Sequence, residues 1–147
     1  MSNRTETLDE FFDSYAARFN EALQGGKLDT DATAECFADC FTEASPLGII
    51  CKQNDGEFRK VIPRGYKFYR EIGVTAMDLI STEITILDDF HAMVKAHWNC
   101  EYTRKDDKSG AIEFAVIYCV QTLKNKHKIF AYITGDEQQA LKDIGLV

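Results

Sequence analysis

The sequence predicts an α+β fold, with N-terminal helices packed in the concave face of a curved, mostly antiparallel sheet. Two observations support this prediction. Three helical segments rich in aromatic side chains come first, and residues 77–134 then contain four consecutive strands. Strands joined by short loops pair in antiparallel fashion, so these four form a continuous sheet. At 147 residues, without an internal repeat or a linker, residues 1–147 are expected to form one domain.

The first helix is predicted from Thr7 to Leu23. Thr7 and Glu10 have the spacing of a capping box. Apolar side chains recur at steps of three and four residues along the segment, which indicates one buried stripe. Gly25 and Gly26 end the helix, because glycine adopts the left-handed cap conformation without strain.

Two more helices are expected before the four strands. The second covers residues 30–41, with acidic residues near its positively polarised N-terminus and with Ala34, Phe37, Cys40 and Phe41 on its inward face. Residues 45–51 form a turn that leads into a short strand, and residues 54–56 form another turn. Pro63 suits the first position of a third, short helix that closes at Gly73.

The four strands are predicted at residues 77–87, 90–103, 111–123 and 127–134, followed by one or two helical turns in residues 136–146. In the second of them, alternate residues from Ala92 to Tyr102 form an apolar face toward the helices. The last strand leaves two registers open. The residues that face inward are either Phe130 and Tyr132, or Ile129, Ala131 and Ile133.

The strand at 111–123 is largely apolar on both faces. Its outer positions include Ile117, Cys119 and Leu123, although helices are expected on the other face only. An apolar outer face needs a cover, and a second copy of the same sheet is the simplest one. The sequence therefore predicts a homodimer through the sheet face.

Composition excludes several classes of partner. The net charge of -7 argues against nucleic acid and anionic membranes. No apolar run reaches the roughly 20 residues of a membrane span, and the N-terminus lacks the apolar core of a secretory signal, so a cytoplasmic location is expected. The five cysteines lack C-x-x-C spacing, and no metal or nucleotide motif is present, so reduced thiols and no cofactor are expected. The basic segment 52–70 is interpreted as a solvated face, with attraction of an anionic ligand as the alternative.

Six segments of the chain carry a resemblance to a known family. They are Phe11–Asn20, Phe37–Cys40, Ser45–Gly48, Ala92–Trp98, Ile112–Phe114 leading to Tyr118, and Tyr132–Glu137. Together they resemble the nuclear-transport-factor-2-like (NTF2-like) superfamily, in its SnoaL-like and ketosteroid-isomerase-like branch. The resemblance implies a cone, in which a curved sheet wraps the helices and an apolar pocket opens at one end. It does not imply one activity, because this scaffold carries isomerases, dehydratases, cyclases, epoxide hydrolases and binding modules.

The isomerase pattern of this branch matches the chain at one position of three. Tyr15 stands where the family has the tyrosine that polarises a carbonyl. Ser45 stands in place of the aspartate that acts as general base, and Cys119 or Tyr118 stands in place of the second, protonated aspartate. Proton abstraction needs a base within hydrogen-bond reach, which a serine alone does not provide. The isomerase mechanism is therefore not expected.

Five side chains are predicted to line the pocket: Tyr15, Phe19, Tyr69, Trp98 and Tyr118. Buried phenol and indole groups need polar partners, so several of them converging in one cone indicate a cavity that holds water or a ligand. The alternative is that they are packed core.

Three functions remain open from the sequence. The first is binding of a small, mostly apolar molecule in the cone. The second is a lyase, isomerase or cyclase acting on a small carbonyl or aromatic compound, with Tyr15 as hydrogen-bond donor. The third is a non-catalytic protein-interaction module that uses the sheet face. A buried acid or histidine beside Tyr15 would favour the second function, and a filled core without a cavity would favour the third.

Overall fold

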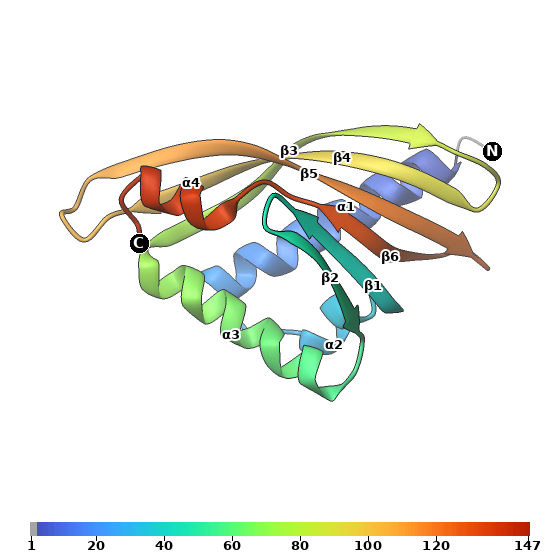
Figure 1. The fold of residues 1–147 in the computed structure, drawn as a ribbon, viewed down its shortest axis with the longest axis horizontal. Coiled ribbons are helices and arrows are strands. Elements are labelled where there is room, and N and C mark those ends of the chain that lie inside the picture. Colours follow the sequence, from blue (N-terminus) through green and yellow to red (C-terminus); the bar gives the residue numbers. More distant parts are fainter. Residues whose placement is uncertain (1–2) are drawn as a thin grey trace.

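A computed structural model describes residues 3–147 and contains four helices and six strands (Figure 1). The elements are α1 (Asn3–Leu23), α2 (Thr30–Ala34), β1 (Phe37–Ser45), β2 (Gly48–Gln53), α3 (Gly56–Ile72), β3 (Val74–Ile86), β4 (His91–Thr103), β5 (Ser109–Leu123), β6 (Lys126–Ile133) and α4 (Glu137–Asp143). Within residues 3–147, no helix combines the length and the apolar character needed to cross a membrane.

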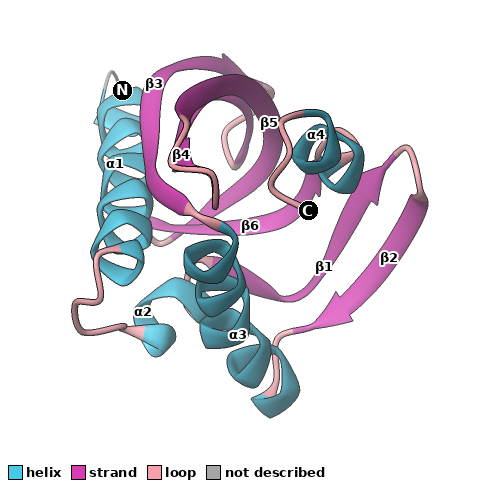
Figure 2. Ribbon diagram, turned by 90° about the vertical axis from the view of Figure 1, so that its left-hand side faces the viewer, coloured by secondary structure: helices cyan, strands magenta, loops and turns pink. Residues whose placement is uncertain are grey.

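The strands form one curved sheet in the order β2-β1-β6-β5-β4-β3 (Figure 2). All neighbouring strands are antiparallel except β1 and β6, which are parallel. Helix α1 packs on the buried face of the sheet with contacts to β3 and α3, and α2 contacts α3. The predicted α+β fold, with N-terminal helices on a curved and mostly antiparallel sheet, is confirmed. The four predicted strands are β3 to β6.

The second predicted helix is correct only in its first turns. Helix α2 ends at Ala34, and Phe37 already begins β1. Phe37 and Phe41, which suggested a helical stripe, are both buried in the strand, because a separation of four residues returns to the same face in a helix and in a strand. The apolar spacing at these positions does not distinguish the two structures.

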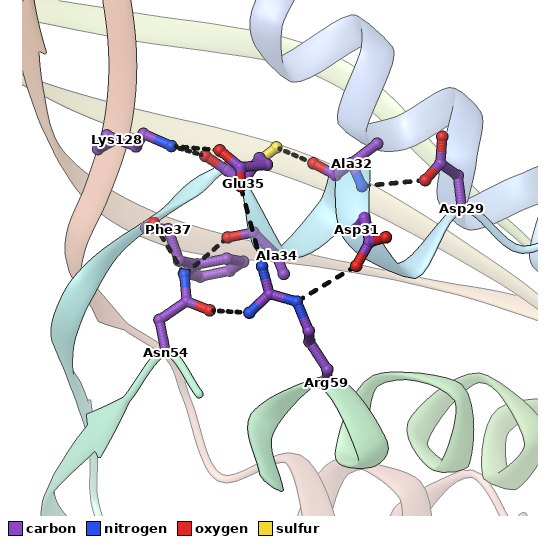
Figure 3. A network of polar contacts seen from close by, with 10 residues as sticks. Asp29, Asp31, Ala32, Ala34, Glu35, Phe37, Asn54, Arg59 and Lys128 are labelled. Atoms are coloured by element: carbon purple, nitrogen blue, oxygen red, sulfur yellow. Dashed lines mark hydrogen bonds and ion pairs between the residues drawn. The ribbon is translucent and has the colours of Figure 1, made fainter. Parts of the chain in front are cut away.

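One side chain holds the junction between α2 and β1 (Figure 3). The Asn54 amide donates hydrogen bonds to the carbonyl oxygens of Ala34 and Phe37, at 2.8 and 3.0 Å. Arg59 donates to the Asn54 amide oxygen at 3.1 Å and pairs with Asp31 at 3.2 Å. Asn54 thus joins the last carbonyl group of the helix to the first carbonyl group of the strand, which stabilises the change from helix to strand.

The boundaries of the other two predicted helices also need correction. Helix α1 is described from Asn3, so Thr7 lies inside it, and the Thr7 hydroxyl donates to the Arg4 carbonyl oxygen at 3.1 Å instead of capping the helix. Helix α3 begins at Gly56, where the predicted turn 54–56 supplies Asp55 as N-cap. Pro63 lies in its interior, at the cost of one helical hydrogen bond.

The basic segment 52–70 is largely paired within the chain. Besides the pair with Asp31, Arg59 contacts Glu35 at 3.8 Å, and Lys52 lies 3.3 Å from Glu43. Arg70 donates to the Ala22 carbonyl oxygen at 2.8 Å. Arg59 and Arg70 thus hold α3 against neighbouring elements, whereas Lys60 and Lys67 pair with glutamates of the same helix.

Strand β6 combines both registers left open by the sequence. Ile129 is fully buried and Tyr132 also faces inward, whereas Phe130 and Ile133 are exposed. A bulge explains this result, because Val120 pairs with Ile129 but the preceding residue of β5 pairs with Ala131. One extra residue in a strand moves the following side chains to the opposite face.

Candidate functional site

A cavity of ≈ 360 Å³ lies between the buried face of the sheet and helices α1, α3 and α4. Its lining includes eight aromatic side chains and three carboxylates. Among the described residues that line it there is no lysine, arginine or histidine. The volume falls within the range of small-molecule sites, roughly 300–1,000 Å³.

All five side chains predicted to line a pocket lie around this cavity. Tyr15 and Phe19 come from α1, one turn apart on the same face, and Tyr69 comes from α3. Trp98 comes from the buried face of β4, and Tyr118 from that of β5. The Tyr15 ring centre lies 6.3 Å from that of Trp98 and 6.4 Å from that of Tyr118. That these side chains bind a ligand stays a prediction.

Tyr15 is an available hydrogen-bond donor. Burial, followed by the neighbouring Tyr118, raises the pKa of Tyr15 well above its usual value, so the phenol is protonated at neutral pH. Within residues 3–147 its hydroxyl has no hydrogen-bond partner. Burial also raises the pKa of Tyr118, although a hydrogen bond from Trp98 opposes the shift. A ligand oxygen beside Tyr15 would therefore meet a phenol that can donate.

Glu43 is a cavity residue that the sequence analysis missed. It lies opposite Tyr132 in the parallel pairing of β1 with β6. The Tyr132 hydroxyl donates to Glu43 Oε1 at 3.2 Å, and Lys52 Nζ lies 3.3 Å from Glu43 Oε2. Burial, followed by the charge of Glu43, raises the pKa of Tyr132. Assigning residues 37–45 to a strand would have placed Glu43 on the same face as the buried Phe41.

Glu137 is the second missed carboxylate. It follows Asp136, whose side chain accepts from the Gln139 backbone N–H at 3.0 Å and caps α4. The Tyr69 hydroxyl donates to Glu137 Oε1, which joins α3 to α4 at the cavity. Burial, followed by the charge of Glu137, raises the pKa of Tyr69. The sequence placed one or two helical turns here but no functional residue.

Of the positions compared with the isomerase pattern, Tyr15 and Tyr118 line the cavity and Ser45 does not. Ser45 does not line the cavity, and its hydroxyl accepts the Leu47 backbone N–H at 3.1 Å. Tyr118 rather than Cys119 faces the cavity. Glu43 lies two residues before Ser45, and therefore on the same face of β1. A carboxylate thus enters the cavity from β1, two residues before the position at which the isomerase pattern has its general base.

The five cysteines are free thiols, with Cys36 and Cys100 buried and Cys40 and Cys51 exposed. Cys100 lines the cavity, where burial and then the charge of Glu137 raise its pKa to about 11. Among the described residues, no three His, Cys, Asp or Glu side chains are grouped closely enough to hold a metal ion. The polar chemistry of the site therefore lies in its phenols and carboxylates.

Comparison with known proteins identifies the family of the chain. A family model described as NTF2-like protein (DUF6841) matches residues 5–137. A comparison with curated protein sequences gives no match.

Solved structures with the same fold share little sequence with this chain. An NTF2-like protein of unknown function from Shewanella oneidensis is 17% identical, with a TM-score of 0.61 over 90% of this chain and 99% of that one. A ketosteroid isomerase-like protein from Erwinia carotovora is 16% identical, with a TM-score of 0.61 over 88% and 93%. A protein of unknown function with a cystatin-like fold from Nostoc punctiforme is 15% identical, with a TM-score of 0.60 over 93% and 94%. At such identities the similarity concerns the fold.

Proposed function

Because the chain belongs to the NTF2-like family (DUF6841), whose scaffold serves many activities, we propose its function from the cavity itself: binding of a small, mostly apolar molecule. The observation that carries this proposal is the free Tyr15 hydroxyl inside a cavity of ≈ 360 Å³. A packed core would surround such a group with protein partners. An unpaired donor above apolar walls suits a ligand with one acceptor oxygen.

The lining suggests how the ligand would lie. Phe19 and Trp98 offer apolar contact on either side of Tyr15, which would donate to a carbonyl or ether oxygen. Glu43 and Glu137 also line the cavity, where their carboxylates would accept hydrogen bonds from polar groups of the ligand. The bound molecule would therefore have an apolar body and few polar substituents.

Emission of Trp98 tests this proposal, because it is the only tryptophan in the chain. A panel of steroids, aromatic ketones and polyketide fragments should include a compound that changes the emission with saturation. Tyr15→Phe should lower the affinity for that compound about 2- to 10-fold, which corresponds to the usual net free energy of one hydrogen bond. The matched control is Tyr102→Phe, a partly buried tyrosine of β4 outside the cavity lining. A panel without any saturable change would contradict the proposal.

Glu43 favours a second candidate, an enzyme acting on a small carbonyl or aromatic compound. In this reading Glu43 removes a proton next to the carbonyl while Tyr15 donates to the oxygen that gains charge. Exchange of such protons for deuterium, followed by NMR on a panel of cyclic ketones, tests it. Exchange above the buffer rate that is lost in Glu43→Gln and retained in Glu57→Gln would support the enzyme. Equal exchange with and without the protein would exclude it for those ketones.

We also propose that a second copy of the chain covers the outer sheet face. Large apolar side chains exposed there include Met93, Leu123, Phe130 and Ile133. The free energy gained by burying such a patch supports association of two copies. Sedimentation at micromolar concentration should give a species of twice 16.7 kDa. Phe130→Glu should shift it to the monomer, and a monomeric wild-type protein would contradict the homodimer.

A further inference from the structure

The charges around the cavity are one-sided. Glu43, Asp136 and Glu137 line it, and the described lining contains no basic side chain. Of these three carboxylates, Glu43 alone has a cation beside it within residues 3–147, namely Lys52 at 3.3 Å. Asp136 uses its carboxylate to cap α4. Glu137 has no ion pair within the described residues and accepts only the neutral hydroxyl of Tyr69.

Glu43 and Glu137 both act on one phenol, that of Tyr132. The Tyr132 hydroxyl donates to Glu43 Oε1 at 3.2 Å, and the charge of Glu137 also acts on Tyr132. The Glu137 side chain is exposed, so this carboxylate lies at the mouth of the cavity, whereas Trp98 is buried. The cavity therefore has an apolar inner part and a negatively charged mouth.

Aromatic rings extend from this mouth into the cavity. The ring centres of Tyr118 and Tyr132 lie 6.3 Å apart, and those of Phe19 and Tyr69 lie 5.6 Å apart. Ring faces attract cations, and carboxylates accept strong hydrogen bonds from ammonium groups. A bound carboxylate would instead face the negative charge of Glu137. The described lining offers it no basic side chain, and the nearby Lys52 is already paired with Glu43.

We propose that the cavity selects organic cations, namely molecules with an apolar or aromatic body inside the cone and an ammonium group at the mouth beside Glu137 and Glu43. This inference rests on the proposed binding function and specifies its ligand class. Glu137 supplies the unpaired charge, while the rings of Tyr69 and Tyr132 flank the ammonium. The apolar body extends toward Trp98.

A matched series of probes tests the selection: 4-phenylbutylamine, 4-phenylbutyltrimethylammonium, 4-phenylbutanol and 4-phenylbutanoate. They share one apolar body and differ only in the charge at its end. Titrations that follow Trp98 emission and calorimetry should show the two cations binding about fivefold to tenfold more tightly than the alcohol, with the carboxylate weakest. This preference should decrease as salt is added, because the mouth is open to solvent.

Substitutions assign the selection to the carboxylates. Glu137→Gln keeps an acceptor for Tyr69 and removes the charge. It should therefore weaken binding of the amine severalfold and leave binding of the alcohol unchanged. Glu43→Gln provides a second, independent variant, and Glu57→Gln, on an exposed side chain at the start of α3, is the matched control. Circular dichroism before and after heating verifies that each variant is folded.

The outcomes separate this inference from the function on which it rests. If the alcohol binds as tightly as the amine, or if 4-phenylbutanoate binds best, cation selection is wrong while the binding function stands. If selectivity survives in both Glu137→Gln and Glu43→Gln, its assignment to these carboxylates is wrong. If no member of the series binds while a compound of the ketone and steroid panel does, cation selection is wrong and the binding function stands; if neither set binds, both proposals are wrong.

Discussion

The two ends of α1 differ in what they meet on the sheet. At one end Leu8 and Phe12 are completely buried, and Phe12 contacts Tyr118 with ring centres 4.9 Å apart. At the other end Tyr15 and Phe19 continue the same apolar stripe but line a cavity. One amphipathic pattern therefore makes both a filled core and a hollow site.

The difference lies in the elements that surround each end. The fully buried side chains around the filled end include Val94 and Val120, which come from adjacent strands of the sheet. The hollow end is also bounded by α3 and α4, whose Tyr69 and Glu137 contact each other. At the hollow end α3 and α4 meet through the polar contact of Tyr69 with Glu137 at the rim, and the space between them and the sheet stays open. At the filled end apolar side chains are in direct contact and leave no space.

Alkaline titration should affect the hollow end most strongly. The folded state raises the pKa values of Tyr15, Tyr69, Tyr118 and Tyr132 above the unfolded value of about 10. Below pH 10 these phenols are protonated in both states and do not change the free energy of unfolding. Above pH 10 the unfolded state loses protons that the folded state keeps. Stability should then fall by up to about 1.4 kcal/mol per phenol for each pH unit.

Urea unfolding at several pH values measures this slope. Tyr15→Phe removes one titrating group and should reduce the slope, whereas Tyr102→Phe, outside the cavity lining, serves as the control. A free energy of unfolding that stays constant through pH 11 would contradict the burial of these phenols.

Two phenylalanines on α1 directly compare the filled end of the helix with the end that lines the cavity. Phe12→Ala should cost about 3–5 kcal/mol, because it leaves a hole in a closed core. Phe19→Ala should cost about half as much, since the side chain already borders empty space. Denaturant unfolding of both variants measures the difference. Equal losses would show that the two ends are packed alike.

Trp98 lies where the two regions meet, buried in the sheet and in contact with the cavity. Trp98→Ala should cost less than the roughly 3–5 kcal/mol of a fully packed tryptophan and should weaken ligand binding instead. Chemical unfolding together with calorimetric titration of a bound probe tests both effects. A variant that barely folds, with no ligand found for the wild type, would favour the interaction module.

Asn54 tests the junction between α2 and β1, and its side chain is not part of the cavity lining. Asn54→Ala removes two hydrogen bonds to the carbonyl oxygens of Ala34 and Phe37 and should cost about 1–3 kcal/mol. Ligand affinity should not change. A large loss of binding without loss of stability would mean that the two regions are coupled.

Thiol reactivity gives the smallest effect. Cys100 should react at least about tenfold more slowly than the exposed Cys40, because it is buried and its pKa is raised to about 11. A bound ligand should slow Cys100 further and leave Cys40 unchanged. Mass spectrometry of timed modification distinguishes them. Rapid reaction of Cys100 in the folded protein would contradict its place on the inner face of β4.

The sequence by itself determined the buried face of β4 and part of the lining of the cavity. Alternation along β4 separates Trp98 from its polar neighbours, and helical spacing places Tyr15 above Phe19. Both patterns are local, so they can be recognised without knowing the fold. They were enough to select five of the eight aromatic side chains that line the cavity.

The tertiary structure decided the end of α2, the bulge in β6 and the carboxylates at the cavity. Glu43 meets Tyr132 across 89 residues, and Tyr69 meets Glu137 across 68. Phe37 and Phe41 fit a helix and a strand equally well until β1 pairs with β6. Contacts between distant segments depend on sheet order and register, and local periodicity contains no information on either.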